Sequence, residues 1–398
     1  MDKAVAVIGG GPAGLMAAEV LSSAGRPVTI YERMPSLGRK FLMAGRGGLN
    51  LTHSEDFRAF LGRYGPAGRM MKPLLETFTP GDLVAWADGL GQTTFIGSSG
   101  RMFPNSLKAS PLLRAWLARL DAQGVKFRTR MAWRGWTEDG ALLFETGETV
   151  RPSATVLALG GASWAKLGSD GAWATILARQ GVELTPFEPA NSGFTVNWSP
   201  VFKVRFAGQP LKAIAVTHGR RTVRGEAVVA AYGVEGGAIY ALSSDIRAAI
   251  TADGSTTIEI DLRPDLTTAH LAARLDRPRD GQSTATFLRK AVNLSPVEIN
   301  LLREAHGVAL PADLAAAIKR APLQLTGLQG IARAISTAGG VRLDAVDAHL
   351  MLKARPDVYV AGEMLDWEAP TGGYLLQACF ATGAAAAHAI LAKRSGAE

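Results

Sequence analysis

The hydrophobic positions near the amino terminus form short continuous runs separated by glycines. Residues 4–8 (AVAVI) are wholly apolar, as expected for a parallel strand that is covered on both faces. Residues 27–31 (PVTIY) form a second run rich in β-branched side chains, and residues 15–23 between the two runs are rich in Ala, Leu and Met. The pattern predicts a strand, a helix and a second strand within about 30 residues.

Short apolar segments return further along the chain. Residues 126–130, 131–136, 141–145 and 154–159 read as short strands separated by turns, which predicts a β-meander ahead of Gly160 and Gly161. Near the carboxyl terminus, residues 357–361 (DVYVA) predict a buried strand. A glycine pair, Gly372 and Gly373, then opens an alanine-rich helix over residues 374–391.

The middle of the chain has a different pattern. Alternation at residues 203–206, 213–217, 226–229 and 256–260 predicts antiparallel strands, and residues 266–320 are helical in pattern, with a capping box from Ser295 to Glu298. We therefore expect an α/β fold in which a discontinuous Rossmann-like domain, residues 1–189 and 336–398, is split by an insertion. The inserted cap domain, residues 190–335, is expected to be antiparallel β over 190–263 and helical over 264–335.

The turn after the first strand reads GGGPAG, a GxGxxG motif that contains Pro12 and Ala13. Gly9 permits a tight turn, Gly11 lets the backbone approach a pyrophosphate, and Gly14 lets the helix pack close to the strand. Glu32 closes the second strand, where it is placed to accept hydrogen bonds from an adenosine ribose. This context predicts dinucleotide binding; the acid disfavours NADP and leaves NAD and FAD open.

Composition and charge narrow the remaining classes. The 45 glycines in 398 residues are about 11% of the chain, against a usual 7% or so. A single cysteine excludes a disulfide framework and a dithiol mechanism, and the six histidines are too scattered to indicate a metal site. The net charge of +8 is spread along the chain, which favours anionic small molecules over nucleic acid. No targeting or membrane-spanning segment is expected, so the prediction is a cytoplasmic protein.

Five blocks in order carry a family resemblance. They are ERxxxxGRK with GRGGLNLTH from Glu32 to His53, GRMFPNSLKAS from Gly100 to Ser110, LGGASWAKLGSDG from Leu159 to Gly171, TAGGV from Thr337 to Val341, and AGEMLD with TGGYLLQ between Ala361 and Gln377. The chain resembles the bacterial FAD-dependent oxidoreductases described as aminoacetone-oxidase-like flavoproteins, whose FAD domain is of the glutathione-reductase type. Gly48, Leu49 and Leu375 depart from the family pattern, which indicates a subfamily with its own substrate.

The motif and the resemblance together imply a set of FAD-binding residues. Backbone groups near Ala132 and Trp133 are expected to read the adenine edge, with core packing as the alternative role of Trp133. The amides at the start of the last helix are expected to face the flavin N1–C2=O region. The full set is Gly9, Gly11, Pro12, Ala13, Gly14, Glu32, Arg33, Arg39, Lys40, Gly45, Arg46, Gly47, Gly48, Asn50, Ala132, Trp133, Leu159, Gly160, Gly161, Trp164, Gly362, Glu363, Gly372, Gly373, Tyr374 and Leu376.

The expected reaction is hydride transfer between a small organic substrate and flavin N5. No second GxGxxG in a strand–turn–helix context follows Gly14. This favours either an oxidase, acting on an amine or an aminoketone, or a reductase whose NAD(P)H donor visits the substrate cavity. An RNA-associated flavoprotein is the alternative. The sequence assigns no catalytic residue; Arg46, Asn50, His53, Trp164 and Lys166 lie in blocks expected near the flavin. The oligomeric state stays open.

Overall fold

The computed structural model describes residues 3–44 and 47–395. Contacts divide the chain into two compact units. Unit 1 is Met1–Glu188 together with Ile335–Glu398, and unit 2 is Pro189–Ala334. Each unit has its own hydrophobic core, so each is described separately.

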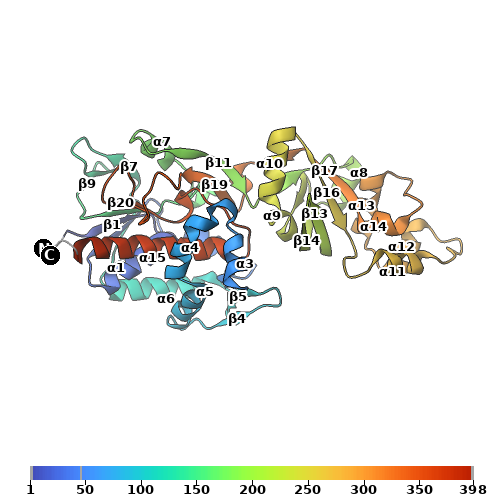
Figure 1. The fold of residues 1–398 in the computed structure, drawn as a ribbon, viewed down its shortest axis with the longest axis horizontal. Helices are drawn as coiled ribbons and strands as arrows, with labels where there is room; N and C mark the ends of the chain where they lie inside the picture. The colour runs from blue at the N-terminus through green and yellow to red at the C-terminus, as the bar shows by residue number, and fades with distance from the viewer. Residues whose placement is uncertain (1–2, 45–46, 396–398) are drawn as a thin grey trace. The chain divides into compact units, whose positions relative to one another are not determined.

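The centre of unit 1 is a five-stranded sheet in the order β20-β10-β1-β2-β6. Figure 1 labels two of these strands, β1 and β20. Every pair in it is parallel, with Ala6 of β1 opposite Thr29 of β2 and Thr155 of β10. Its strands are β1 (Val5–Ile8), β2 (Val28–Glu32), β6 (Lys126–Thr129), β10 (Thr155–Leu157) and β20 (Val358–Val360). Parallel neighbours need crossover connections, which places the loops after the strands along one edge of the sheet.

A buried carboxylate joins the helices of unit 1. Glu19 of α1 (Pro12–Ser23) accepts hydrogen bonds from the indoles of Trp86 and Trp116, at 2.9 and 2.5 Å, and from Arg119 at 2.8 Å. Because the buried charge is fully paired, it fixes α1 against α5 (Pro80–Asp88) and α6 (Ala109–Ala122). The other helices are α2 (Arg39–Ala44), α3 (Phe57–Gly62), α4 (Gly68–Thr77) and α7 (Trp173–Ala178).

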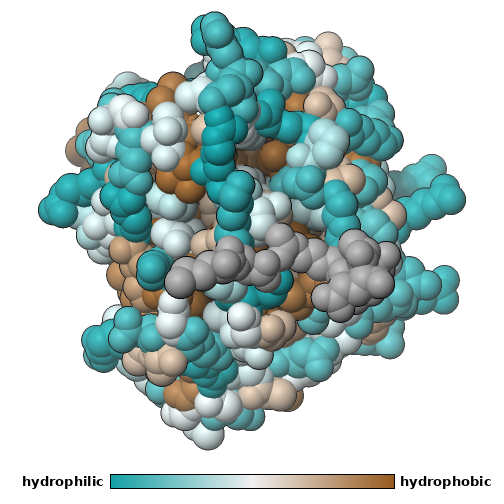
Figure 2. All heavy atoms as spheres, turned by 90° about the vertical axis from the view of Figure 1, so that its left-hand side faces the viewer, coloured by the Kyte–Doolittle hydropathy of each residue, from teal (hydrophilic) through white to brown (hydrophobic). Residues whose placement is uncertain are grey.

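The last helix, α15 (Tyr374–Ser395), is long and apolar enough over Tyr374–Lys393 to cross a membrane by length and composition alone. In the structure it packs beside α1 and α4 and buries residues such as Ala378, Phe380 and Ala384 in the core of unit 1 (Figure 1). The end of unit 1 drawn in Figure 2 is mainly hydrophilic, and its hydrophobic areas are small and separate. We therefore interpret α15 as a core helix.

The predicted meander is partly wrong. Only β7 (Trp133–Trp136), β8 (Leu142–Phe144) and β9 (Thr149–Val150) form an antiparallel sheet. The first and last of the four predicted strands, β6 and β10, belong to the parallel sheet. A short apolar strand looks the same in either setting, so the pattern does not choose its partner.

Two smaller sheets complete unit 1. β3 (Thr52–His53), β5 (Arg101–Pro104) and β4 (Thr94–Ile96) form an antiparallel sheet. β11 (Leu184–Ala190) pairs with β19 (Ser336–Val341), the strands by which the chain leaves and re-enters unit 1.

Unit 2 is built on a seven-stranded antiparallel sheet in the order β17-β16-β13-β14-β15-β12-β18. Its strands are β12 (Phe194–Thr195), β13 (Pro210–His218), β14 (Arg221–Ala230), β15 (Gly233–Glu235), β16 (Thr256–Asp261), β17 (Ala321–Leu325) and β18 (Gly327–Leu328). Its helices are α8 (Pro200–Phe206), α9 (Gly237–Tyr240), α10 (Ser243–Asp253), α11 (Thr268–Leu275), α12 (Thr284–Val292), α13 (Pro296–His306) and α14 (Leu314–Lys319).

Two details of the insertion were predicted wrongly. Residues 203–206 lie in α8, not in a strand, because Ser199 caps a helix that has Pro200 at its first position. The division into a β half and a helical half also fails, since α8, α9 and α10 precede residue 264 and β17 and β18 follow it. The capping box from Ser295 to Glu298 is confirmed, and so is the α/β class.

Candidate functional site

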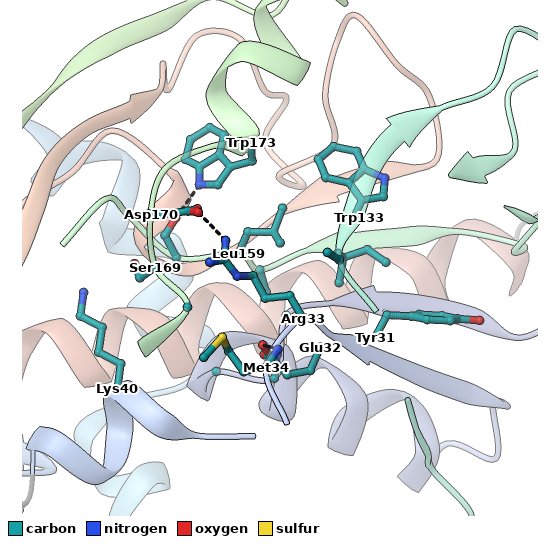
Figure 3. A pocket seen from close by; sticks show the side chains of 18 of the residues that line it. Tyr31, Glu32, Arg33, Met34, Lys40, Trp133, Leu159, Ser169, Asp170 and Trp173 are labelled. Atoms are coloured by element: carbon teal, nitrogen blue, oxygen red, sulfur yellow. Dashed lines mark hydrogen bonds and ion pairs between the residues drawn. The ribbon is translucent and has the colours of Figure 1, made fainter. Parts of the chain in front are cut away.

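Unit 1 contains a cavity of about 680 Å³ beside the carboxyl ends of its parallel strands. Ile8, Glu32 and Ala361, at or just after the ends of β1, β2 and β20, contribute to its lining. In open parallel sheets, ligands bind at this edge, and the volume is in the range of small-molecule sites. Figure 3 shows Lys40 and Trp133 on opposite sides of the cavity.

The glycine turn after β1 is shaped for close approach. Gly9 has φ +110°, and a Cβ there would lie 2.2 Å from the carbonyl oxygen of Ala158. A Cβ at Gly14 would lie 2.0 Å from the oxygen of Gly9, so only hydrogen fits between the helix and the turn. At Gly11, by contrast, a Cβ would meet no atom within 4 Å. Gly11 is the N-cap of α1, so this free space lies at the amino terminus of the helix, whose first amides are suited to an anion.

Glu32 connects this turn to the end of β2. Its Oε2 accepts a hydrogen bond from the Gly10 amide and its Oε1 accepts one from the Met34 amide, both at 2.8 Å. A carboxylate oxygen has room for a second donor, so these bonds leave acceptor capacity for a ligand hydroxyl. The ribose role of Glu32 stays a prediction; in the structure the residue also shapes the turn.

At the Lys40 end of the cavity, an ion pair joins four separate sequence blocks. Lys40 Nζ donates to Glu363 Oε2 and to Ser163 Oγ, both at 2.7 Å. Glu363 also accepts from the Thr337 amide at 2.9 Å and from the Gly161 amide at 3.3 Å. Burial, and then the Glu363 charge, raise the pKa of the neighbouring Cys379 thiol to about 12, so this cysteine stays protonated.

The opposite end is formed by the β7–β9 sheet and α7. Ala132 and Trp133 line the cavity, although the Ala132 carbonyl already accepts from the Glu145 amide at 2.8 Å. Trp133 is 6% exposed and packs edge-on against Trp136, as expected for core packing. Its indole N–H is buried and finds no partner in the described chain. Trp173 of α7 lies on the facing wall and donates to the Gly160 carbonyl at 2.8 Å (Figure 3).

Other predicted residues lie outside the lining of this cavity. Tyr374, at the start of α15, belongs to a cluster of polar side chains. Its hydroxyl donates to Glu55 at 2.6 Å, and Arg63 donates twice to the same carboxylate. The His53 ring stacks on the Tyr374 ring. We call His53, Glu55, Arg63 and Tyr374 the Tyr374 cluster. The predicted residues that do not line the cavity are Gly14, Gly47, Gly48, Asn50, Gly161, Trp164, Gly372, Gly373, Tyr374 and Leu376.

Four more residues that the sequence placed near the flavin are Gly45, Arg46, His53 and Lys166. Gly45 and Arg46 lie outside the described residues. His53 Nε2 lies 3.0 Å from the Ser99 carbonyl and Nδ1 accepts from the Glu55 amide, so both ring nitrogens have backbone hydrogen-bond partners. Lys166 is exposed on the short helix Ala165–Leu167.

Several lining residues were not predicted. Trp173, Ile176 and Arg179 sit three residues apart around α7, so their spacing is a signal for one helix face. Asp170 and Ser169 lie in a block that the sequence had singled out without assigning their roles. Gly10, Met34 and Cys379 carried no comparable signal.

The residues present fit an adenine dinucleotide. The helix terminus with free space at Gly11 suits a pyrophosphate, Glu32 has remaining acceptor capacity, and the cavity extends from Trp133 to Glu363. The Arg39 Nε–H, on the cavity wall, is buried and lacks a partner among the residues described. Within residues 3–44 and 47–395, no group of three or more His, Cys, Asp or Glu side chains is placed to hold a metal ion.

Two proteins of named function align with nearly the whole chain. A protein named 3-dehydro-bile acid delta(4,6)-reductase, from Clostridium scindens, is 27% identical over 99% of both chains. A ribosomal RNA dihydrouridine synthase from Escherichia coli is 24% identical over 98% of both chains. Among solved structures, 3-ketosteroid delta1-dehydrogenase from Sterolibacterium denitrificans superposes with a TM-score of 0.54 at 11% identity, covering 98% of this chain and 100% of the other. That level of identity supports the fold alone.

A family model described as the HI0933-like protein Rossmann domain matches residues 3–389, which include both segments of unit 1 and all of unit 2. Together with the glycine turn and the cavity beside it, this match identifies the class of protein. The chain belongs to the HI0933-like family of FAD-dependent oxidoreductases.

Proposed function

We propose that the protein transfers hydride between flavin N5 and a small organic substrate, and that it works as a reductase of unsaturated ketones. The cavity carries the cofactor part of the proposal, because Gly9, Gly11 and Glu32 shape it for a dinucleotide. The relative named as a 3-dehydro-bile acid delta(4,6)-reductase supports the reductase direction and the substrate class. Oxidation of an amine or aminoketone is the competing direction.

Different residues along the cavity would bind different parts of the cofactor. The amides at the start of α1 would hold the pyrophosphate, and Glu32 would accept from the ribose. Lys40 and Glu363 would orient the part of the cofactor that lies away from Trp133, because their ion pair lies at that end of the cavity. Bound FAD supplies the hydride chemistry, and the protein supplies position and electrostatics. Electrons would come from NAD(P)H binding on the substrate side, since the sequence offers no second dinucleotide motif.

An anaerobic half-reaction experiment tests this function. The purified protein is loaded with FAD, reduced with NADH or NADPH, and mixed with a 3-keto-4-ene steroid while the flavin absorbance is followed. We expect the steroid to reoxidise the flavin at a rate well above buffer alone. Reduction of the oxidised flavin by an amine, with no reoxidation by the steroid, would establish the oxidase direction instead. A colourless protein that refuses FAD would overturn the cofactor assignment.

A second function has its own support. The ribosomal RNA dihydrouridine synthase aligns with 98% of this chain. Unit 2 carries 17 Lys and Arg against 12 Asp and Glu, which is most of the chain's net charge. Phosphate contacts make RNA binding steeply dependent on salt. The second proposal is that RNA is the substrate. It requires that a ribosomal RNA fragment bind with micromolar or better affinity at 150 mM salt and reoxidise the reduced flavin. Binding that disappears at that salt would indicate non-specific charge attraction.

A further inference from the structure

The segment from Gly160 to Trp173, which we call the strap, folds over one wall of the cavity. Ser169 Oγ donates to the Gly161 carbonyl at 2.9 Å and Trp173 Nε1 donates to the Gly160 carbonyl at 2.8 Å, so the strap is closed on itself. Trp164 (φ +64°) and Gly168 (φ +108°) flank the short helix Ala165–Leu167, both with left-handed backbone. Leu167, Gly168, Ser169 and Asp170 line the cavity.

The strap reaches the opposite wall at two points. The backbone of Gly168 lies against Met34, since a Cβ at Gly168 would be 2.8 Å from Met34 Cγ. Next to it, the Arg33 guanidinium forms an ion pair with Asp170, whose second oxygen accepts from the Ala172 amide at 3.1 Å. Arg33 and Asp170 both line the cavity, and Figure 3 shows the bond between them close to Trp173.

We propose that the Arg33–Asp170 pair is a latch that closes the strap over the adenosine end of the cavity and must open for FAD to enter or leave. The inference rests on FAD as the cofactor of the proposed function. The two side chains are 33% and 32% exposed, so water and salt compete for the pair and it opens readily. Glu32, whose expected partner is the ribose, is the residue directly before Arg33, which places the latch at that end of the ligand.

A latch and an ordinary ligand contact have different kinetic signatures. If the pair only blocks passage, its removal speeds association and dissociation by the same factor and leaves the equilibrium unchanged. If Arg33 or Asp170 instead contacts FAD in the complex, its removal speeds dissociation alone and weakens binding. The ratio of the two rates therefore distinguishes the two roles.

The experiment uses the full-length protein stripped of FAD and the fluorescence change on FAD binding, followed by stopped flow. For Asp170→Asn we expect both rates to rise three- to tenfold, with a dissociation constant within twofold of wild type. Arg33→Gln should raise the association rate by a similar factor. The double variant should be no faster than either single variant, because one pair is broken in each. Raising NaCl from 0.05 to 0.5 M should speed dissociation in the wild type and have little effect on dissociation in the variants.

Arg151→Gln provides the matched control. Arg151 pairs with Asp139 in the same unit, but both side chains are more than half exposed and neither lines the cavity. Its rates should equal those of the wild type. Unchanged rates in Asp170→Asn, or faster dissociation with unchanged association, would overturn the latch while leaving FAD binding intact. Failure of the wild type to bind FAD would overturn the proposed function as well.

Discussion

The cavity and the Tyr374 cluster both lie in unit 1 and use their polar groups in opposite ways. Around the cavity, the side chains of Glu32, Lys40 and Glu363 are held by neighbours at its walls and leave a continuous space between them. In the Tyr374 cluster, the carboxylate of Glu55 binds both the Tyr374 phenol and the Arg63 guanidinium. The first region is organised for a ligand and the second is organised to hold the chain.

The titration behaviour of the cluster agrees with this structural role. Burial, and then the Glu55 carboxylate, raise the pKa of the Tyr374 phenol far above its usual range, so it remains a hydrogen-bond donor. Burial raises the pKa of Glu55, but hydrogen bonds from Arg63 and Tyr374 outweigh it, and the net shift is downward. At neutral pH the Glu55 hydrogen bonds therefore join a carboxylate to a neutral phenol and a charged guanidinium.

The largest effect is expected at Gly9, where the cavity wall has no room. Gly9→Ala places a Cβ 2.2 Å from the Ala158 oxygen at a positive φ, and we expect a loss of at least about 3 kcal/mol of folding free energy. Gly11→Ala is the control, because its Cβ enters free space. It should keep the wild-type Tm and weaken FAD binding. Equal Tm values for the two variants would contradict the geometry of the turn.

The next effect separates the two regions directly. Glu55→Gln removes the charge that Arg63 and Tyr374 share, and we expect a loss of roughly 1–3 kcal/mol of folding free energy in urea titrations, with one FAD still bound per chain. Glu76→Gln, which breaks the exposed pair with Lys72, should cost less than about 0.5 kcal/mol. If Glu55→Gln abolished FAD binding while the fold remained, the cluster would belong to the ligand site.

Glu32→Gln sharpens the role of the cavity wall. The amide retains one acceptor oxygen, so one of the two backbone amides loses its partner and the predicted ribose contact weakens. We expect the Kd for FAD to rise about tenfold, equivalent to roughly 1.4 kcal/mol, with a small change in Tm. An unchanged Kd in equilibrium fluorescence titration would mean that Glu32 shapes the glycine turn and makes no contact with FAD.

The smallest effect is a pH dependence. The folded-state pKa of Glu55 lies below its unfolded value, so its stabilising contribution is present above the unfolded pKa of about 4.3 and is lost as pH falls through the folded value. The stability difference between wild type and Glu55→Gln should be constant from pH 7 to about pH 5 and shrink below about pH 4. A difference that grows on acidification would reverse the sign of the assigned shift.

Much of unit 1 was predictable because its signals are local. The β1–α1–β2 unit follows from an apolar run, a glycine turn and a second apolar run that are contiguous in the chain. In unit 2, the capping box at Ser295 was found for the same reason. β17 and β18, and the placement of β6 and β10 in the parallel sheet, were missed because short strands acquire their identity from partners distant in sequence.

The candidate site also has a part that the sequence predicts and a part that only the tertiary structure reveals. The sequence by itself determined the dinucleotide turn, since φ +110° at Gly9 and the contact at Gly14 demand residue types that can be read directly. Only the tertiary structure decided that Lys40 pairs with Glu363 and that Arg33 meets Asp170 across the cavity. These partners are separated by 323 and 137 residues. A charged side chain gives no sign of its partner until the backbone brings the two together.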